Sequence, residues 1–162
     1  MKDHFRLFAR YNRWANDRLF DAVAALPEER FREDRGAFFG SLCGTLNHIL
    51  VGDQLWMRRF EGAGPQPPSL DTILHPDLPG LRAAREAEDA RILAFVEAQD
   101  EARFAGTLAY TNVRGERWEQ PFSAVLGHLF NHQTHHRGQA HTLLSQFGHT
   151  PPELDLIYFM RE

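Results

Sequence analysis

The sequence has little cysteine and little lysine, and it has no long apolar run. Its single cysteine, Cys43, excludes an internal disulfide and is typical of a protein in a reducing cytoplasm. No run of about 18 apolar residues is present, so the sequence predicts no membrane span. The charged opening MKDHFRLFARYNRW lacks an apolar core and does not resemble a signal peptide. We therefore expect a cytoplasmic protein with no membrane partner.

Positive charge is also scarce. The chain carries 18 Lys and Arg against 22 Asp and Glu, which gives a net charge of −4 and a pI near 6.1. Arginine supplies nearly all of the positive charge, and no basic cluster is interleaved with aromatic residues, so we expect no nucleic-acid partner. A chain of 162 residues fits one domain with one core, and we expect a single domain over residues 1–162.

Four long segments have the apolar spacing of amphipathic helices. Pro27 ends the first segment, and the Pro- and Gly-rich stretch 62–78 after the second predicts a surface crossover loop. The last segment begins near Pro121, a residue that suits the first turn of a helix, and ends before Gly148. The predicted helices cover residues 3–26, 38–61, 81–103 and 121–147.

The pattern changes before the last of these helices. Residues 104–110 and 116–120 have strand-like composition, and Gly115 between them can take the left-handed conformation of a hairpin turn. The tail that begins at Pro151 is expected to pack back onto the helices as a short turn or helix. The sequence therefore predicts an all-α fold, a four-helix bundle with a long crossover loop and a small β-hairpin before the last helix.

Five of the nine histidines lie between positions 128 and 141, and His128, His132 and His136 are four residues apart. On a helix this spacing places the imidazoles on one face. At about 100° per residue, His136 falls inside the apolar arc of the last helix and His132 falls on its shoulder. His128 and His135 fall at the edge of the arc, and His141 falls on the far side. His132 and His136 are therefore the pair expected to face the interior.

Two buried imidazoles one turn apart need partners, because a buried polar group without a hydrogen bond costs a few kcal/mol. One transition-metal cation would satisfy both rings, and hydrogen bonds to backbone or to Asn and Gln are the alternative. A third ligand should come from another helix. His48 is the only histidine in the second helix, where it is either part of a pocket wall or a satisfied, half-buried histidine. Its face also carries small residues, namely Ser41, Gly44, Thr45 and Gly52.

Three further polar residues fall near the inner faces of the first two helices. Asp53 falls inside the apolar arc of the second helix, and Asn12 and Asn16 lie near the inner face of the first. We interpret Asp53 as a buried carboxylate bonded to the asparagine amides, with a positioning or acid–base role as the alternative. No spacing argument selects a general base among Asp53, Glu153 and Tyr158.

Two residues of the helices call for a packing interpretation. Cys43 lies on the flank of its helix without a basic neighbour, which indicates packing and not a nucleophile. Gly138 interrupts the last helix, where glycine costs about 1 kcal/mol relative to alanine. We therefore expect another backbone to approach Gly138 closely.

Taken together, these motifs resemble the DinB/YfiT-like family, and the resemblance covers nearly the whole chain. One motif is Leu46-Asn47-His48-Ile49-Leu50 followed by Asp53 and Trp56. A second and more specific motif is His128-x-x-Asn131-His132-x-x-His135-His136-Arg137-Gly138-Gln139. The opening of the chain is also similar, with Tyr11-Asn12-x-Trp14-Ala15-Asn16.

The resemblance implies an up-down-down-up four-helix bundle that holds a divalent metal with three histidines. Matched by position, the metal ligands are His48, His132 and His136. Members of the family are often homodimers, and some are transferases or isomerases that use low-molecular-weight thiols. The residues expected to surround or tune the site are His128, His135, Asp53, Asn47, Arg137 and Gln139.

Three neutral imidazoles leave a cation with an open position, which is typical of a catalytic metal. Zinc, nickel or iron would suit these ligands, because imidazole binds all three. The leading hypothesis is a metal-dependent enzyme that activates a thiol or water, such as a thiol-dependent S-transferase acting on a small molecule. The first alternative is a non-catalytic metal-bound protein that binds a ligand or serves in a stress response. The second is a structural bundle with buried histidines. The resemblance also implies a homodimer.

Overall fold

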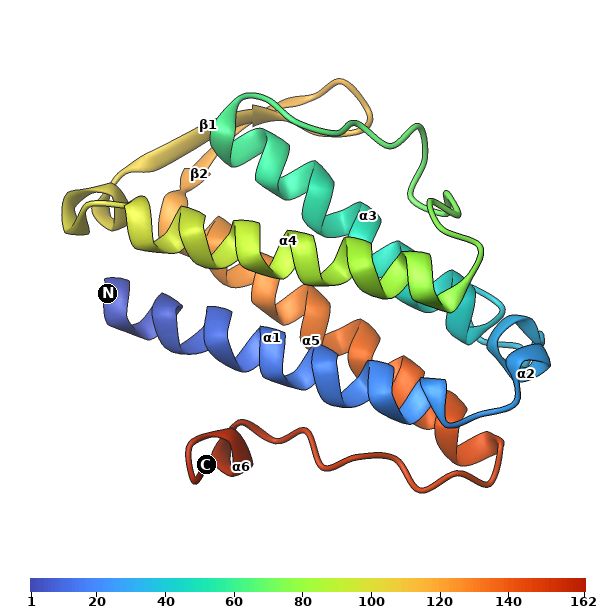
Figure 1. The fold of residues 1–162 in the computed structure, drawn as a ribbon. Coiled ribbons are helices and arrows are strands. Elements are labelled where there is room, and N and C mark those ends of the chain that lie inside the picture. The colour runs from blue at the N-terminus through green and yellow to red at the C-terminus, as the bar shows by residue number, and fades with distance from the viewer.

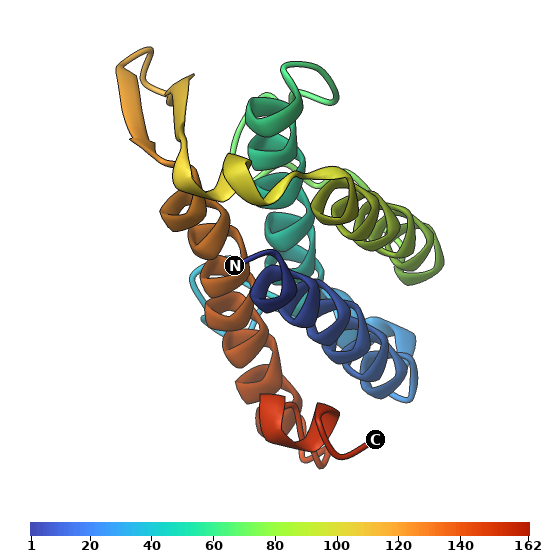
Figure 2. The ribbon, with the colours of Figure 1, turned by 90° about the vertical axis from the view of Figure 1, so that its left-hand side faces the viewer.

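The computed structural model describes residues 1–162 and contains four long helices (Figure 1). Helices α3 and α4 run parallel to each other and antiparallel to α1 and α5, because the crossover 62–77 returns the chain to the end where α3 began. Around the bundle, α1 and α3 each contact both α4 and α5 (Figure 2). The predicted all-α bundle with a crossover loop is confirmed. Its long helices are α1 (Lys2–Ala24), α3 (Leu42–Glu61), α4 (Leu78–Ala98) and α5 (Phe122–Gln146).

Side-chain caps fix the starts of the two parallel helices. The Ser41 hydroxyl accepts the N–H of Gly44 at 3.1 Å at the start of α3, and the Asp77 carboxylate accepts the N–H of Gly80 at 2.8 Å at the start of α4. Gly62 ends α3 in the left-handed conformation, with a φ of 75°. No helix combines the length and the hydropathy needed to cross a membrane.

Two predicted helix boundaries were wrong. The second helix was predicted to begin at residue 38, but Gly40 has a φ of 74° and Ser41 is extended, so α3 begins at Leu42. The third predicted helix divides into α4 and a 3-10 helix, η1 (Glu101–Ala105). A short helix after Pro27, α2 (Glu28–Arg32), was not predicted, because five residues are too few for an apolar period to be visible.

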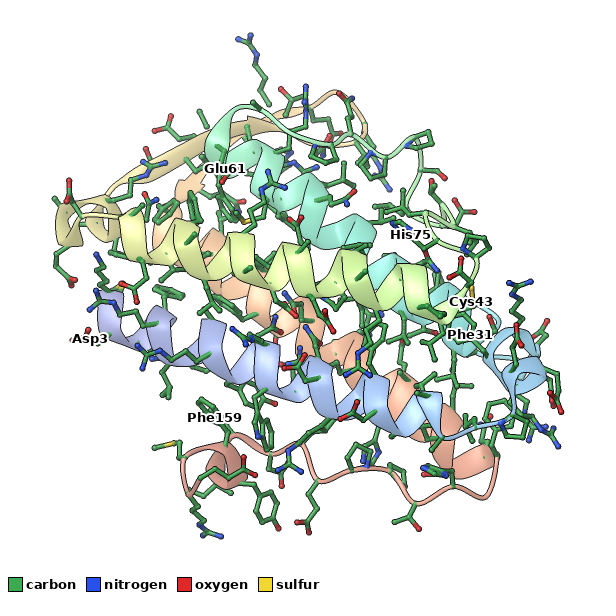
Figure 3. The ribbon with its side chains drawn as sticks, viewed as in Figure 1. Asp3, Phe31, Cys43, Glu61, His75 and Phe159 are labelled. Carbon is green, nitrogen blue, oxygen red and sulfur yellow. The ribbon has the colours of Figure 1, made fainter.

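The hairpin and the short helix of the tail lie close to their predicted positions. Strands β1 (Thr107–Thr111) and β2 (Arg117–Pro121) pair antiparallel, and Gly115 in the turn has a φ of 82°. The tail returns along α1 to α6 (Leu156–Phe159). There the ring of Phe159 packs against Trp14, with centroids 5.7 Å apart (Figure 3).

Two apolar clusters of 13 buried residues each fill the interior of the bundle. One lies at the end where α1 and α5 begin. The other lies at the opposite end, where Phe31 of α2 and Cys43 of α3 are buried (Figure 3). Between the clusters is a polar layer, to which all four long helices contribute. The polar layer consists of the buried side chains Asn12, Asn16, His48, Asp53, Arg85, Asp89, Gln133, His136 and Arg137.

Candidate metal centre

His48, His132 and His136 meet where the polar layer reaches the contact between α3 and α5. The Nε2 atom of His48 lies 3.1 Å from Nε2 of His132 and 3.1 Å from Nε2 of His136. The three ligand atoms all lie within 4.8 Å of one another, and no other histidine, cysteine or carboxylate belongs to the cluster. Nitrogens bound to one cation at about 2.0–2.1 Å are separated by roughly 3 Å. The spacing therefore fits a single transition-metal ion.

Hydrogen bonds on the far side of two rings determine which nitrogens carry protons. The Nδ1 atom of His48 lies 2.8 Å from the carbonyl oxygen of Leu70, and Nδ1 of His136 lies 2.8 Å from Oε1 of Gln139. Both oxygens can only accept, so each Nδ1 donates a proton and each Nε2 of the neutral ring carries a lone pair. Two lone pairs that face each other at 3.1 Å repel, and a cation between them would remove the repulsion. Carbonyl partners of this kind also hold metal-binding histidines in place.

Burial keeps these rings in the neutral form that a metal requires. Desolvation lowers the pKa of His48 and the pKa of His136 below the usual 6.5. Desolvation lowers the pKa of His132 to about 3, and the neighbouring histidines add to the effect. The Nδ1 atom of His132 is buried without a hydrogen-bond partner. Because metal binding requires deprotonated imidazole, the donor set is prepared for a cation at neutral pH.

This shift predicts a pH dependence for the metal-free protein. His132 has a folded pKa of about 3 and an ordinary value of 6.5, so the unfolded chain binds more protons between these values. Its contribution to stability is complete above pH 6.5 and falls by about 1.4 kcal/mol per pH unit below it. In urea unfolding at several pH values between 5 and 7, the free energy of unfolding should fall more steeply on acidification for wild type than for His132→Leu. Parallel curves would contradict the assignment.

The crossover loop supplies part of the centre and is held by Asn47, one of the residues expected around the site. The Asn47 amide donates to the carbonyl oxygen of His75 at 2.9 Å, and its oxygen accepts the N–H of His75 at 2.9 Å. His75 lies in the crossover (Figure 3), five residues beyond the Leu70 carbonyl that binds His48. Asn47 therefore holds the crossover loop in place, and the loop in turn orients the ring of His48, which lies on α3 like Asn47.

Two residues of the centre were missed from the sequence. Leu70 acts through its backbone carbonyl, which no side-chain pattern can indicate. Phe39 lies in the segment before α3 that was predicted to be helical, and its ring stacks on His48 with centroids 3.9 Å apart. It also meets His136 edge-on at 5.7 Å, so it covers one side of the centre.

The other expected neighbours of the site divide into two groups. Gln139 binds His136 directly, and His135 is exposed with its ring 4.7 Å from that of His136. His128 is exposed one turn before His132 and packs against Trp56. Arg137 and Asp53, by contrast, do not face the three imidazoles but belong to the hydrogen-bond network of the polar layer.

In that network, Asp89 of α4 accepts from both asparagines of α1. The amide of Asn12 lies 3.0 Å from the carboxylate, and the amide of Asn16 lies 3.0 and 3.1 Å from its two oxygens. The oxygens of the same two asparagines accept from the Arg137 guanidinium of α5. The two amides thus connect a buried anion to a buried cation across α1.

The expectation that Asp53 binds the asparagines is wrong. Asp53 instead accepts from Arg85 of α4, whose second nitrogen lies 3.0 Å from Asp89 without the alignment of a hydrogen bond. Burial raises the pKa of Asp53 to about 7, although the Arg85 charge opposes the rise. The arc of α3 correctly placed Asp53 inward but could not show which neighbouring helix would supply its partner.

Glycine permits the close contact between α3 and α5. A Cβ atom at Gly52 would lie 2.7 Å from Cε1 of His132, so only glycine lets this ring sit against the α3 backbone. The close approach expected at Gly138 is wrong, because nothing lies within 4 Å of a Cβ placed there. The glycine that permits a close contact is therefore Gly52 on α3, and not Gly138 on α5.

These two glycines give a matched pair of substitutions. Gly52→Ala should displace the His132 ring and weaken zinc binding by about tenfold or more, measured by competition with a chelator. Gly138→Ala should leave zinc affinity unchanged and stabilise α5 by about 0.5–1 kcal/mol in urea unfolding. Unchanged zinc affinity in Gly52→Ala would show that the ring position does not depend on this contact.

A hollow of about 200 Å³ opens beside His48 and His132. Its wall comes from α3, the crossover, the hairpin turn and α5. A larger hollow of about 430 Å³, between α1, α2 and the start of α4, shares no residue with the histidine cluster. Besides the two histidines, the residues that line the smaller hollow are Gly52, Leu55, Trp56, Arg59, Leu70, Asn112, Val113 and His128.

The fold and the site define a four-helix bundle with a three-histidine centre at a contact between two helices. A family model described as the DinB family matches residues 1–162, and the chain belongs to that family. The chain is 27% identical over 167 residues to Protein DinB of Bacillus subtilis (strain 168), covering 96% of this chain and 94% of that protein. The family resemblance expected from the sequence is confirmed.

A solved structure supports the fold independently. The crystal structure of a DinB-like protein from Bacillus cereus ATCC 10987 matches with a TM-score of 0.63. The match covers 90% of this chain and 94% of that one at 20% identity. At this level of identity the similarity concerns the arrangement of the helices.

Proposed function

We propose that the protein is a metal-dependent enzyme in which His48, His132 and His136 hold a divalent zinc, nickel or iron ion. The convergence of their Nε2 atoms carries the proposal, because two of the rings are fixed as lone-pair donors by oxygens behind them. Three neutral ligands would leave the cation its full charge and room for a further ligand, as in catalytic zinc sites. The chemistry that such an ion would supply is a lowered pKa for a thiol or water, which favours nucleophilic attack.

His128 is the residue of the hollow best suited to accept a proton. Its ring lies 5.9 Å from that of His132, and partial desolvation by the side chains around it, together with the Arg59 charge, lowers its pKa below 6.5. It is therefore neutral near pH 7 and can take the proton of an S–H or O–H group. The sulfur or oxygen lone pair forms the new bond to carbon, and the bond that breaks gives its electron pair to the departing chloride or to the ring oxygen of an epoxide.

The test compares metal content with turnover. The protein is loaded in turn with zinc, nickel and iron, and consumption of a small thiol is followed against aryl chlorides and epoxides. We expect turnover by at least one metal form, and none by His132→Ala/His136→Ala. Full activity of this double variant would overturn the proposal. His128→Gln should bind metal normally and lose about 100-fold in rate, which is the typical contribution of a general base.

A metal-bound protein that binds a ligand without catalysis is the second candidate. It is favoured by the absence of any carboxylate from the wall of the hollow, which leaves His128 as the one proton acceptor besides the ligands. This function predicts that small thiols raise the Tm of the metal-loaded protein while no electrophile is converted.

A further inference from the structure

Arg59 is a positive charge in the wall of the hollow that no acidic residue neutralises. Its guanidinium carbon lies 4.3 Å from the centre of the Trp56 ring and 5.3 Å from the centre of the Tyr110 ring. Burial lowers the pKa of Arg59. A partly desolvated cation without a counter-ion carries a free-energy cost, which a bound anion would offset.

The neighbouring charged groups are already occupied. Arg58 donates to the carbonyl oxygen of Gly64 at 2.7 Å, and Glu61, which ends the same helix, pairs with Arg91 of α4. Arg58 and Glu61 therefore each have a partner, whereas Arg59 makes no hydrogen bond within the protein. Its contacts with the Trp56 and Tyr110 rings restrict the movement of the guanidinium, so binding of a ligand would cost little side-chain entropy.

Arg59 is the only positively charged side chain in the wall, because the histidines that line it are neutral near pH 7. The Asn112 side chain is used in its own turn, where its oxygen accepts the N–H groups of Arg114 and Glu116. Apolar side chains of Leu55, Leu70 and Val113 provide most of the remaining surface. A single guanidinium in a volume of about 200 Å³ matches one small carboxylate, which it can bind through two parallel hydrogen bonds. A doubly charged phosphate would call for further donors.

We propose that Arg59 selects a small substrate that carries a carboxylate at one end and its reacting group at the other. The carboxylate binds the guanidinium, and the reacting group extends along the apolar wall to the open face beside His48 and His132. Arg59 is thus a specificity-determining residue. The position of the reacting group rests on the proposed function, but the carboxylate contact does not require a metal.

The test uses two thiols that differ only in charge, mercaptopropionate and its amide, mercaptopropanamide. The zinc-loaded protein is titrated with each, and the NMR shift of the Trp56 indole N–H reports binding next to Arg59. Because a charge-assisted hydrogen-bond pair contributes about 1.5–3 kcal/mol, we expect the acid to bind about tenfold or more tightly than the amide. Arg59→Gln should remove this preference, and Arg59→Lys should restore only part of it, because lysine cannot bind in a bidentate manner.

Arg103→Gln is the matched control, because its guanidinium is also stacked 4.3 Å from a ring centre, that of Phe122, and does not line the hollow. It should keep the preference for the acid. Equal affinities in the wild type, or a preference that survives Arg59→Gln, would overturn the inference.

A second arm separates this inference from the proposed function. Metal-free protein is titrated with propionate and propanamide, which lack the thiol and so report the Arg59 contact alone. Propionate should bind more tightly to the wild type, and the two should bind equally to Arg59→Gln. If the protein takes up no zinc, the proposed function fails and this pair of ligands still decides the role of Arg59.

Discussion

Replacing His136 by alanine is expected to abolish stoichiometric zinc binding. The substitution removes one of three neutral donors and leaves His48 and His132 to hold the ion alone. Loss of an outer hydrogen-bond partner usually weakens a metal site by about 10–100-fold, so loss of a ligand should exceed 100-fold. Metal content after dialysis and competition with a chelator would measure both the stoichiometry and the affinity.

Two further substitutions on α5 make this result specific. Gln139→Ala removes the acceptor behind His136 but leaves all three ligands in place, and it should cost about 10–100-fold in affinity. His141→Ala removes a histidine of the same helix whose Nε2 lies 3.1 Å from the carbonyl oxygen of Pro152, away from the centre. It should bind zinc like the wild type. Stoichiometric zinc in His136→Ala, or an equal loss in His141→Ala, would refute the three-histidine assignment.

The second large effect is expected from Asp89→Ala in the polar layer. Asp89 is a buried anion that accepts from Asn12 and Asn16 and lies 3.0 Å from the Arg85 guanidinium. Its removal leaves donors unpaired and leaves two arginines, Arg85 and Arg137, with one aspartate, Asp53, in the polar layer. Breaking a buried ion pair from one side typically costs about 3–5 kcal/mol, and we expect a loss of that size in the free energy of unfolding by urea.

Glu86→Ala provides the control for this prediction on the same helix. Glu86 is exposed and pairs with Arg82 at 3.1 Å, and surface pairs of this kind contribute at most about 1 kcal/mol. A similar small loss for Asp89→Ala would mean that the network contributes little to stability. Metal-free protein should be used for both variants, so that zinc affinity does not enter the comparison.

The sequence predicted the inward histidines of α5 but not the whole centre. Helical periodicity identifies which side of a helix faces inward, and it placed His132 and His136 correctly. It placed His48 on a face of small residues without deciding its role, and only the family resemblance linked it to the other two. The structure brings the three together.

What periodicity could not supply was the identity of contacts between helices. Asp53 was correctly predicted to lie inside the bundle, but its partner is Arg85 of α4. The apolar pattern of α3 does not show which side chains of α4 face it. The close approach was assigned to Gly138, whereas it occurs at Gly52, because the need for glycine arises from the ring of another helix. Backbone contacts such as the Leu70 carbonyl leave no trace in a side-chain pattern.

The crossover between the two parallel helices has a consequence for how such chains can vary. Surface connections ordinarily tolerate insertions and deletions at little cost. Here residues 70–75 carry both the Leu70 oxygen bound to His48 and the backbone bound to Asn47, so their length is tied to the orientation of an imidazole. Length changes should be accepted between positions 62 and 69 and rejected in the next six residues. The crossover that sets the order of the helices therefore also constrains the geometry of the histidine centre.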